Sequence, residues 1–281
     1  MNTIPRPFAV VTGASGGIGK AIALRLHTAG YSVLAHYARN NGAAMKLKAE
    51  IDGDGGQCFV TQADLATVEG LNSVTEAVDR IIASEPRLEL RALVNNAARL
   101  LGPSFETATV EQFDDFFALN ARAPFFLAQT LAERMVRGGS IVNISSAGVH
   151  FSSPSDIVYA MSKSAVESLT VNAAEALAPQ QIRINTVIPG FTDNGHEAFK
   201  NPEILAYLAG FSVLGGVSAP SAVAEAVWFL VSDSSLRTTG STLDVSGGST
   251  LGARPKSAIS LKTVADEAAA RSIELTDGVS T

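Results

Sequence analysis

The sequence contains little cysteine and little charge. Its 281 residues include one cysteine, Cys58, so no disulfide can form within the chain, which is typical of proteins in a reducing compartment. Charged residues make up only 17% of the chain, and the formal net charge is -6. Because such a chain lacks the clustered Lys and Arg that neutralise a phosphate backbone, we expect no nucleic-acid partner.

The sequence also lacks long apolar runs and metal-binding patterns. No apolar run approaches the ~20 residues that a membrane-spanning helix needs, and the first residues, MNTIPRPFAV, do not resemble a secretory signal. We therefore expect a cytoplasmic protein without a membrane partner. The four histidines, His27, His36, His150 and His196, show no metal-ligand spacing, so we predict no metal site and interpret His150 and His196 as surface histidines.

Apolar residues, in contrast, are abundant. They make up 46% of the chain, and the mean hydropathy of +0.21 predicts a substantial core. Segments with helical spacing separate short runs that have the length and composition of buried strands. These runs cover residues 8–12, 32–37, 58–62, 92–96, 140–145, 182–187 and 241–246. The alternation predicts an α/β fold with a doubly wound, mainly parallel seven-stranded sheet of Rossmann type, with ligands at the carboxyl ends of the strands.

The composition changes only near residue 248. We therefore predict one domain over residues 6–248, in which residues 191–217 form a substrate lid because glycines end this segment and aromatic residues populate it. Residues 249–281 form a C-terminal extension rich in Ser, Thr and Ala. The segment that starts at Thr263 is compatible with one short capped helix.

Glycines follow the first predicted strand directly, in the segment TGASGGIGKAIA. Gly13, Gly17 and Gly19 lie where a strand passes into a helix. Glycine lets phosphate oxygens approach backbone N–H groups, and a helix N-terminus attracts negative charge. The position of these glycines predicts a pyrophosphate-binding loop.

The end of the second predicted strand bears on the choice of cofactor. NAD-binding proteins usually place an acidic residue there for the ribose 2′-hydroxyl, but none occurs between Ser32 and Lys48. Arg39 can instead pair with a 2′-phosphate. We therefore predict a preference for NADP(H), with NAD(H) possible, and the alternative for Arg39 is a solvated loop arginine.

Tyr159 and Lys163 are four residues apart in the segment VYAMSKSAV. On a helix they share one face, so the phenol and the ammonium can point into one space. A nearby cation favours the ionised form of a phenol. The spacing does not say whether that space is filled by solvent.

Together these motifs resemble the short-chain dehydrogenase/reductase family. They comprise TG-x3-G-x-G from Thr12 to Gly19, NNAA at 95–98, Asn120, the serine pair 145–146, Tyr159-x3-Lys163 and PG at 189–190. The resemblance covers residues 6 to 248, and the chain is most similar to single-domain members that include 3-oxoacyl-carrier-protein reductase. Two departures are Ala98, where the family usually has glycine, and Asn194, where a threonine that contacts nicotinamide is common.

The resemblance implies four catalytic residues. Tyr159 would transfer a proton, Lys163 would support it, and Ser146, thirteen residues before the tyrosine, would hold the substrate oxygen. Ser145 would then be structural. Asn120 would complete a proton relay with Lys163 through water, and the alternative for Asn120 is a helix residue that bonds its own backbone.

The resemblance also implies the cofactor-binding residues. These are Gly13, Ser15, Gly16, Gly17, Ile18, Gly19, Arg39, Asp64, Leu65, Asn96, Tyr159, Lys163, Pro189, Gly190 and Thr192. Asp64 would contact adenine, and its alternative is a helix cap. Either Thr192 or Asn194 would contact the nicotinamide in place of the threonine that this sequence lacks.

The predicted function is NADP(H)-dependent transfer of a hydride between nicotinamide and a carbonyl or secondary alcohol of a small molecule, with ketone reduction favoured. The alternatives are a 3-oxoacyl-carrier-protein reductase and a non-catalytic nucleotide-binding regulator. Few basic residues lie near the predicted site, which argues against an acidic carrier, although Arg134 and Arg137 leave a smaller basic surface. The family also implies a homo-oligomer, either a tetramer or a dimer.

Overall fold

The computed structural model describes residues 4–195 and 197–252. His196, the C-terminal extension from residue 253 onward and the short helix predicted within it lie outside the described residues. No helix in the described ranges is long and apolar enough to cross a membrane.

Seven parallel strands form one sheet in the order β3-β2-β1-β4-β5-β6-β7. The strands are β1 (Arg6–Val11), β2 (Ser32–Tyr37), β3 (Cys58–Gln62), β4 (Leu88–Asn95), β5 (Ser140–Ile144), β6 (Arg183–Pro189) and β7 (Thr242–Val245). Every predicted strand is present, with ends that differ by a few residues at most. The predicted fold class is confirmed.

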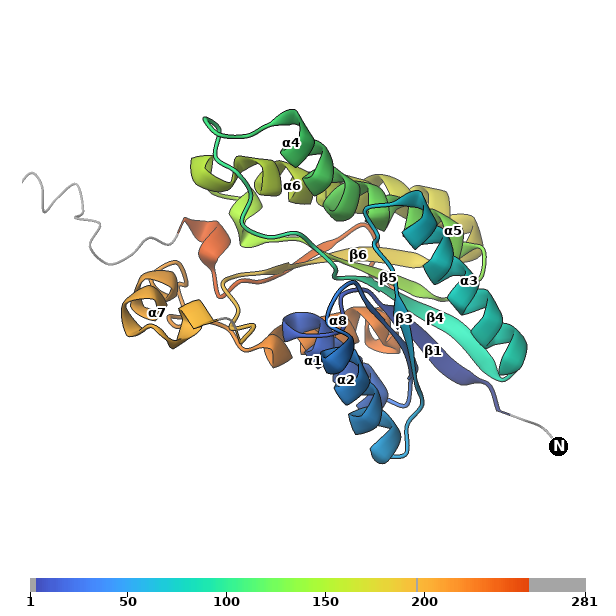
Figure 1. Cartoon of the computed structure of the whole chain (residues 1–281). Helices are drawn as coiled ribbons and strands as arrows, with labels where there is room; N and C mark the ends of the chain where they lie inside the picture. The colour runs from blue at the N-terminus through green and yellow to red at the C-terminus, as the bar shows by residue number, and fades with distance from the viewer. Residues whose placement is uncertain (1–3, 196, 253–281) are drawn as a thin grey trace, which may run out of the picture.

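Helices cover both faces of the sheet, as Figure 1 shows. One face carries α1 (Gly17–Thr28), α2 (Asn41–Gly53) and α8 (Pro220–Val231), and the other carries α3 (Val68–Ser84), α4 (Val110–Phe117), α5 (Ala123–Ala132) and α6 (Ile157–Leu177). A short helix, α7 (Pro202–Ala209), lies beyond the sheet in the predicted lid segment.

The two core layers follow from the two-residue period of the strands. In β1, Phe8 and Val10 point into the layer beneath α3 and α5, whereas Ala9 and Val11 point into the layer beneath α1 and α8. Because both faces are covered, most strand residues are apolar, as expected of a buried parallel sheet.

The strand order reverses between β1 and β4. At such a point the loops that follow neighbouring strands lead to opposite faces and leave a crevice at the carboxyl edge of the sheet. Four sequence motifs follow strands that end at this edge: the glycine loop after β1, Asn96 after β4, the serine pair after β5 and Gly190 at the end of β6. The fold therefore gathers them from distant parts of the sequence.

Candidate active site

The glycine loop has the shape that a phosphate group requires. Gly13 and Gly17 have positive φ angles of 66° and 52°, which glycine adopts without strain. Helix α1 begins at Gly17, and no side chain caps its first N–H groups. A Cβ atom on Gly19 would lie 2.2 Å from the Gly13 carbonyl oxygen, so only glycine permits this close turn. These features fit a dinucleotide pyrophosphate.

Two polar residues hold this loop to β4. The Thr12 hydroxyl accepts hydrogen bonds from the N–H groups of Asn96 (2.9 Å) and Ala97 (3.0 Å). The Asn96 amide donates to the carbonyl oxygens of Thr12 (2.8 Å) and Gly13 (3.2 Å). The side chain of Asn96, predicted to bind the cofactor, therefore shapes the loop that would bind it.

His36 supports the loop from β2, a role that the sequence analysis did not assign. Its Nδ1 accepts a hydrogen bond from the Gly13 N–H group (3.2 Å), and its Nε2 lies 3.0 Å from the Ala63 carbonyl oxygen. Burial lowers the pKa of His36, which favours the neutral ring with one acceptor and one donor that these contacts require. In the sequence, the signal for this role was a histidine within a mostly apolar strand.

The residues predicted to bind the adenosine half of the cofactor follow β2 and β3. Arg39 is exposed, immediately before Asn40, the residue that caps α2. The Asp64 carboxylate accepts the Ala66 N–H group (3.0 Å), while Thr67 caps α3, so the helix-cap alternative for Asp64 is wrong. The Leu65 side chain packs in the core, and its predicted contact with the cofactor stays a prediction.

Lys163 lies one helical turn after Tyr159 in α6, and its side chain is shielded from solvent. Only 3% of Lys163 is exposed, and its Nζ donates to the Ile144 carbonyl oxygen at the end of β5 (2.7 Å). Burial lowers the Lys163 pKa to about 8. The space that the two residues share is therefore part of the protein interior.

The pKa of Tyr159 differs from the sequence expectation. Burial raises it to about 12, a side-chain hydrogen bond with Ser146 lowers it, and the charge of Asp156 raises it. Desolvation of the phenol is the largest effect on this pKa, and the Lys163 ammonium donates to the Ile144 carbonyl oxygen in this structure. The phenol is therefore protonated at neutral pH.

The two serines after β5 face different partners. Ser146 lies beside Tyr159, where its hydroxyl lowers the pKa of the phenol, and this hydroxyl also accepts a hydrogen bond from the Gly148 N–H group (3.2 Å). The Ser145 hydroxyl instead donates to Glu167 (2.5 Å). Ser146 is thus the serine beside the phenol, and its catalytic role stays a prediction.

Asn120 occupies a single π-helical turn, Ala118–Arg122, between α4 and α5. Its amide oxygen accepts the Arg99 N–H group (2.8 Å), and its amide nitrogen donates to the Arg99 carbonyl (3.0 Å) and the Ser162 hydroxyl (3.0 Å). The alternative in which Asn120 bonds its own backbone is wrong. Asn120 joins the loop after β4 to α6, and its predicted water-mediated relay stays a prediction.

The segment after β6 lies against the glycine loop. A Cβ atom on Gly190 would lie 2.6 Å from the Ser246 carbonyl oxygen, so this glycine permits close packing beside β7. The Thr192 hydroxyl donates to the Gly190 carbonyl (3.1 Å). A Cβ atom on Gly17 would lie 3.0 Å from the Cβ of Asn194. Both residues that could replace the family threonine are therefore near the predicted cofactor site.

An aromatic cluster joins the lid to the site. The Phe211 ring, which follows α7, lies 5.7 Å from Phe151, 5.3 Å from Phe191 and 5.3 Å from Tyr207, measured between ring centroids. Phe151 comes from the loop that carries Ser146, and Phe191 directly follows Gly190. These rings pack the lid against two sides of the site.

His27, His36 and His150 lie within the described residues. Among the described residues, no three His, Cys, Asp or Glu side chains are close enough to hold a metal ion. His150 is exposed, as interpreted from the sequence, and its Nε2 lies 3.2 Å from the Glu167 carboxylate.

The chain is similar to known proteins over most of its length. Residues 13–250 match the family model described as "Enoyl-(Acyl carrier protein) reductase". L-xylulose reductase from Caenorhabditis elegans is 34% identical over 85% of this chain and 94% of its own length. The 3-oxoacyl-(acyl-carrier-protein) reductase FabG from Staphylococcus aureus is 31% identical over 85% of this chain and 96% of its own.

A solved structure is similar over nearly the same length. The angucycline C-6 ketoreductase LanV with bound NADP superposes with a TM-score of 0.84 and 38% identity, over 89% of this chain and all of the other. The chain belongs to the short-chain dehydrogenase/reductase family. It is an NAD(P)-dependent oxidoreductase.

Proposed function

We propose that this protein reduces a ketone of an apolar small molecule with NADPH. The observation that carries the proposal is the placement of Ser146 beside a protonated Tyr159 phenol, with Lys163 buried one turn away. Two hydroxyl donors at one point can polarise a carbonyl oxygen, and a nearby cation can stabilise the tyrosinate that remains after proton transfer.

Each residue then has a defined step. Ser146 and Tyr159 hydrogen-bond to the substrate oxygen, and Tyr159 delivers its proton as negative charge develops there. Lys163, with a pKa lowered to about 8, stays largely protonated at neutral pH and offsets the new charge. A bound nicotinamide would supply the hydride. The protonated phenol at neutral pH is the form that the reductive direction requires.

The choice of NADP(H) rests on the end of β2. Arg39 is exposed there, and no acidic residue accompanies it between Ser32 and Lys48. The solved relative LanV holds NADP. We expect Arg39→Asp to shift the preference toward NAD(H), because it replaces a cation with a charge that repels a 2′-phosphate. The measurement is the ratio of kcat/KM for the two cofactors, in which a tenfold change equals about 1.4 kcal/mol. An unchanged ratio would contradict the cofactor assignment.

The aromatic cluster indicates the kind of substrate. Phe151, Phe191 and Tyr207 surround Phe211 on the lid side of the site, and Tyr207 is 58% exposed. Such a wall favours flat, apolar molecules, since aromatic rings stack on one another. Fused-ring aromatic ketones are therefore the first substrates to test. A panel of fused-ring, aliphatic and sugar ketones, each assayed with NADPH and NADH, tests both the reaction and this preference.

A carrier-bound substrate is the second candidate, since FabG is a relative. The surface charges do not favour it, because Arg134 on the neighbouring helix is paired with Asp79 (2.7 Å). We expect similar kcat/KM for a 3-oxoacyl group on the carrier and on a short thiol mimic. A strong preference for the carrier that disappears at high salt would establish docking to an acidic carrier. Absence of turnover with every ketone would favour the third candidate, a nucleotide-binding regulator.

A further inference from the structure

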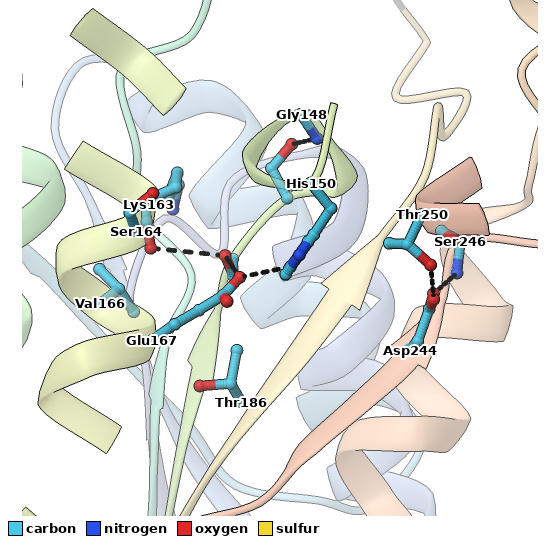
Figure 2. A network of polar contacts seen from close by, with 12 residues as sticks. Gly148, His150, Lys163, Ser164, Val166, Glu167, Thr186, Asp244, Ser246 and Thr250 are labelled. Carbon is cyan, nitrogen blue, oxygen red and sulfur yellow. Dashed lines mark hydrogen bonds and ion pairs between the residues drawn. The ribbon is translucent and has the colours of Figure 1, made fainter. Parts of the chain in front are cut away.

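Glu167 lies one helical turn after Lys163 on α6 and continues the face that carries Tyr159. It takes no part in the proposed reaction, yet its carboxylate is directed inward, with 18% of the side chain exposed. One oxygen, Oε1, accepts the Ser145 hydroxyl (2.5 Å) and lies 3.2 Å from the Nε2 atom of His150. Figure 2 shows Glu167 reaching from α6 toward His150.

Both partners of Glu167 belong to the loop that carries Ser146. Ser145 precedes the catalytic serine, and His150 follows the short 3₁₀ turn Ala147–Val149. A single carboxylate oxygen therefore ties both ends of the loop to the helix that carries Tyr159. The Ser145 backbone N–H group also donates to Val187 on β6 (2.9 Å), which fixes this end of the loop to the sheet.

A second carboxylate, Asp244 on β7, interacts electrostatically with His150. Asp244 accepts the Ser246 N–H group (2.7 Å) and a hydrogen bond from Thr250. Burial raises the Asp244 pKa, whereas these bonds and the charge of His150 lower it to a net value below the usual range. The contact of the imidazole with Glu167 joins His150 to α6.

We propose that Glu167 is a positioning residue that sets the position of Ser146 relative to Tyr159. The proposal rests on the proposed reductase function. Two hydroxyls can polarise one carbonyl oxygen only at a defined separation, and small displacements of such groups reduce the rate strongly. Ser146 has a loop on both sides of it, and Glu167 restrains that loop relative to α6.

The first test uses three variants of the full-length protein. We expect Glu167→Ala to lower kcat by about tenfold or more while KM for NADPH changes little, because the cofactor contacts are not altered. Glu167→Gln retains an oxygen that accepts both bonds and should recover most of the rate. Glu175→Ala removes an exposed glutamate from the same helix and should behave as wild type. Equal kcat for Glu167→Ala and wild type would overturn the proposal.

The second test separates positioning from a general effect on stability. If Glu167 acts through Ser146, adding Glu167→Ala to Ser146→Ala should cause little further loss of kcat, whereas independent effects would multiply. Should Glu167→Ala fail to fold, Ser145→Ala and His150→Ala each remove one tether, and a normal kcat in both would overturn the proposal. A wild-type protein without turnover would refute the proposed function itself.

Discussion

Tyr159 carries the clearest prediction at the scale of a single residue. We expect Tyr159→Phe to abolish turnover, with a loss of at least about a hundredfold in kcat, because the general-acid proton is removed while the ring remains. NADPH affinity should stay within a factor of about two, since the ring supplies the packing. Fluorescence titration with NADPH and a steady-state assay measure the two quantities. Retention of more than a tenth of the wild-type rate would remove Tyr159 from the role of proton donor.

The lowered pKa of Lys163 should make the stability of the protein depend on pH. Its pKa is about 8 in the folded protein, below the ordinary lysine value of 10.5. Below pH 8 both folded and unfolded states bind the proton, and the cost of burying the charge is fully present. Between pH 8 and 10.5 the folded state has released the proton and the unfolded state has not. The free energy of unfolding therefore rises with pH in this window, by up to about 1.4 kcal/mol per pH unit.

Urea unfolding at pH 7.5, 8.5 and 9.0 measures this rise, and Lys163→Met is the control that should lack it. Cys58, whose pKa is raised to about 12 by burial, acts in the opposite direction above pH 9 in both proteins, so the comparison cancels its effect. Identical slopes for wild type and Lys163→Met would show that the lysine does not titrate in this range.

At the scale of elements, the junction of β1 and α1 depends on Gly19. A Cβ atom there would meet the Gly13 carbonyl oxygen at 2.2 Å and the Asn96 amide at 2.6 Å, and both belong to the loop's own hydrogen-bond network. We expect Gly19→Ala to destabilise the protein by about 1–3 kcal/mol and to weaken NADPH binding, because the loop must shift.

The matched control is Gly53→Ala at the end of α2, where an added Cβ meets no atom within 4 Å. It should keep wild-type NADPH affinity and stability, or gain slightly from reduced backbone freedom in the unfolded chain. Thermal unfolding and NADPH titration of the two variants check the contrast. Equal NADPH affinity for both would show that the tight turn is not needed for binding.

At the scale of the whole molecule, α5 and α6 expose apolar side chains on their outer face. Phe125 and Phe126 on α5 are 44% and 43% exposed, and Val171 on α6 is 60% exposed. We propose that this face is covered by another copy of the chain, because contiguous exposed apolar residues favour association.

Light scattering should therefore give a multiple of the 29.2 kDa chain mass, either a dimer or a tetramer. Replacing Phe125 and Phe126 by serine should lower the mass, whereas Met45→Ser, an exposed apolar position on α2 at the opposite face of the sheet, should not. A wild-type mass of one chain at micromolar concentration would contradict the oligomer.

The fold could be predicted from the sequence because its signals are local. Strand and helix periods lie within short windows, and the buried sheet made the strand runs mostly apolar. The motif spacing also predicted that Ser146, Tyr159 and Lys163 share one site. Ser146 follows the carboxyl end of β5, and Tyr159 and Lys163 lie on the next long helix, α6. The expectation that Lys163 would lower the Tyr159 pKa was wrong, because burial of the phenol has the larger effect.

The sequence by itself determined the architecture, the family and the residues offered to the site, because these depend on patterns along the chain. Only the tertiary structure decided that Lys163 is shielded and turned toward Ile144, that Asn120 bonds Arg99 and Ser162, and that Glu167 ties both ends of the Ser146 loop. Those properties arise from contacts between segments far apart in the sequence, and desolvation and hydrogen-bond geometry exist only once these segments pack together.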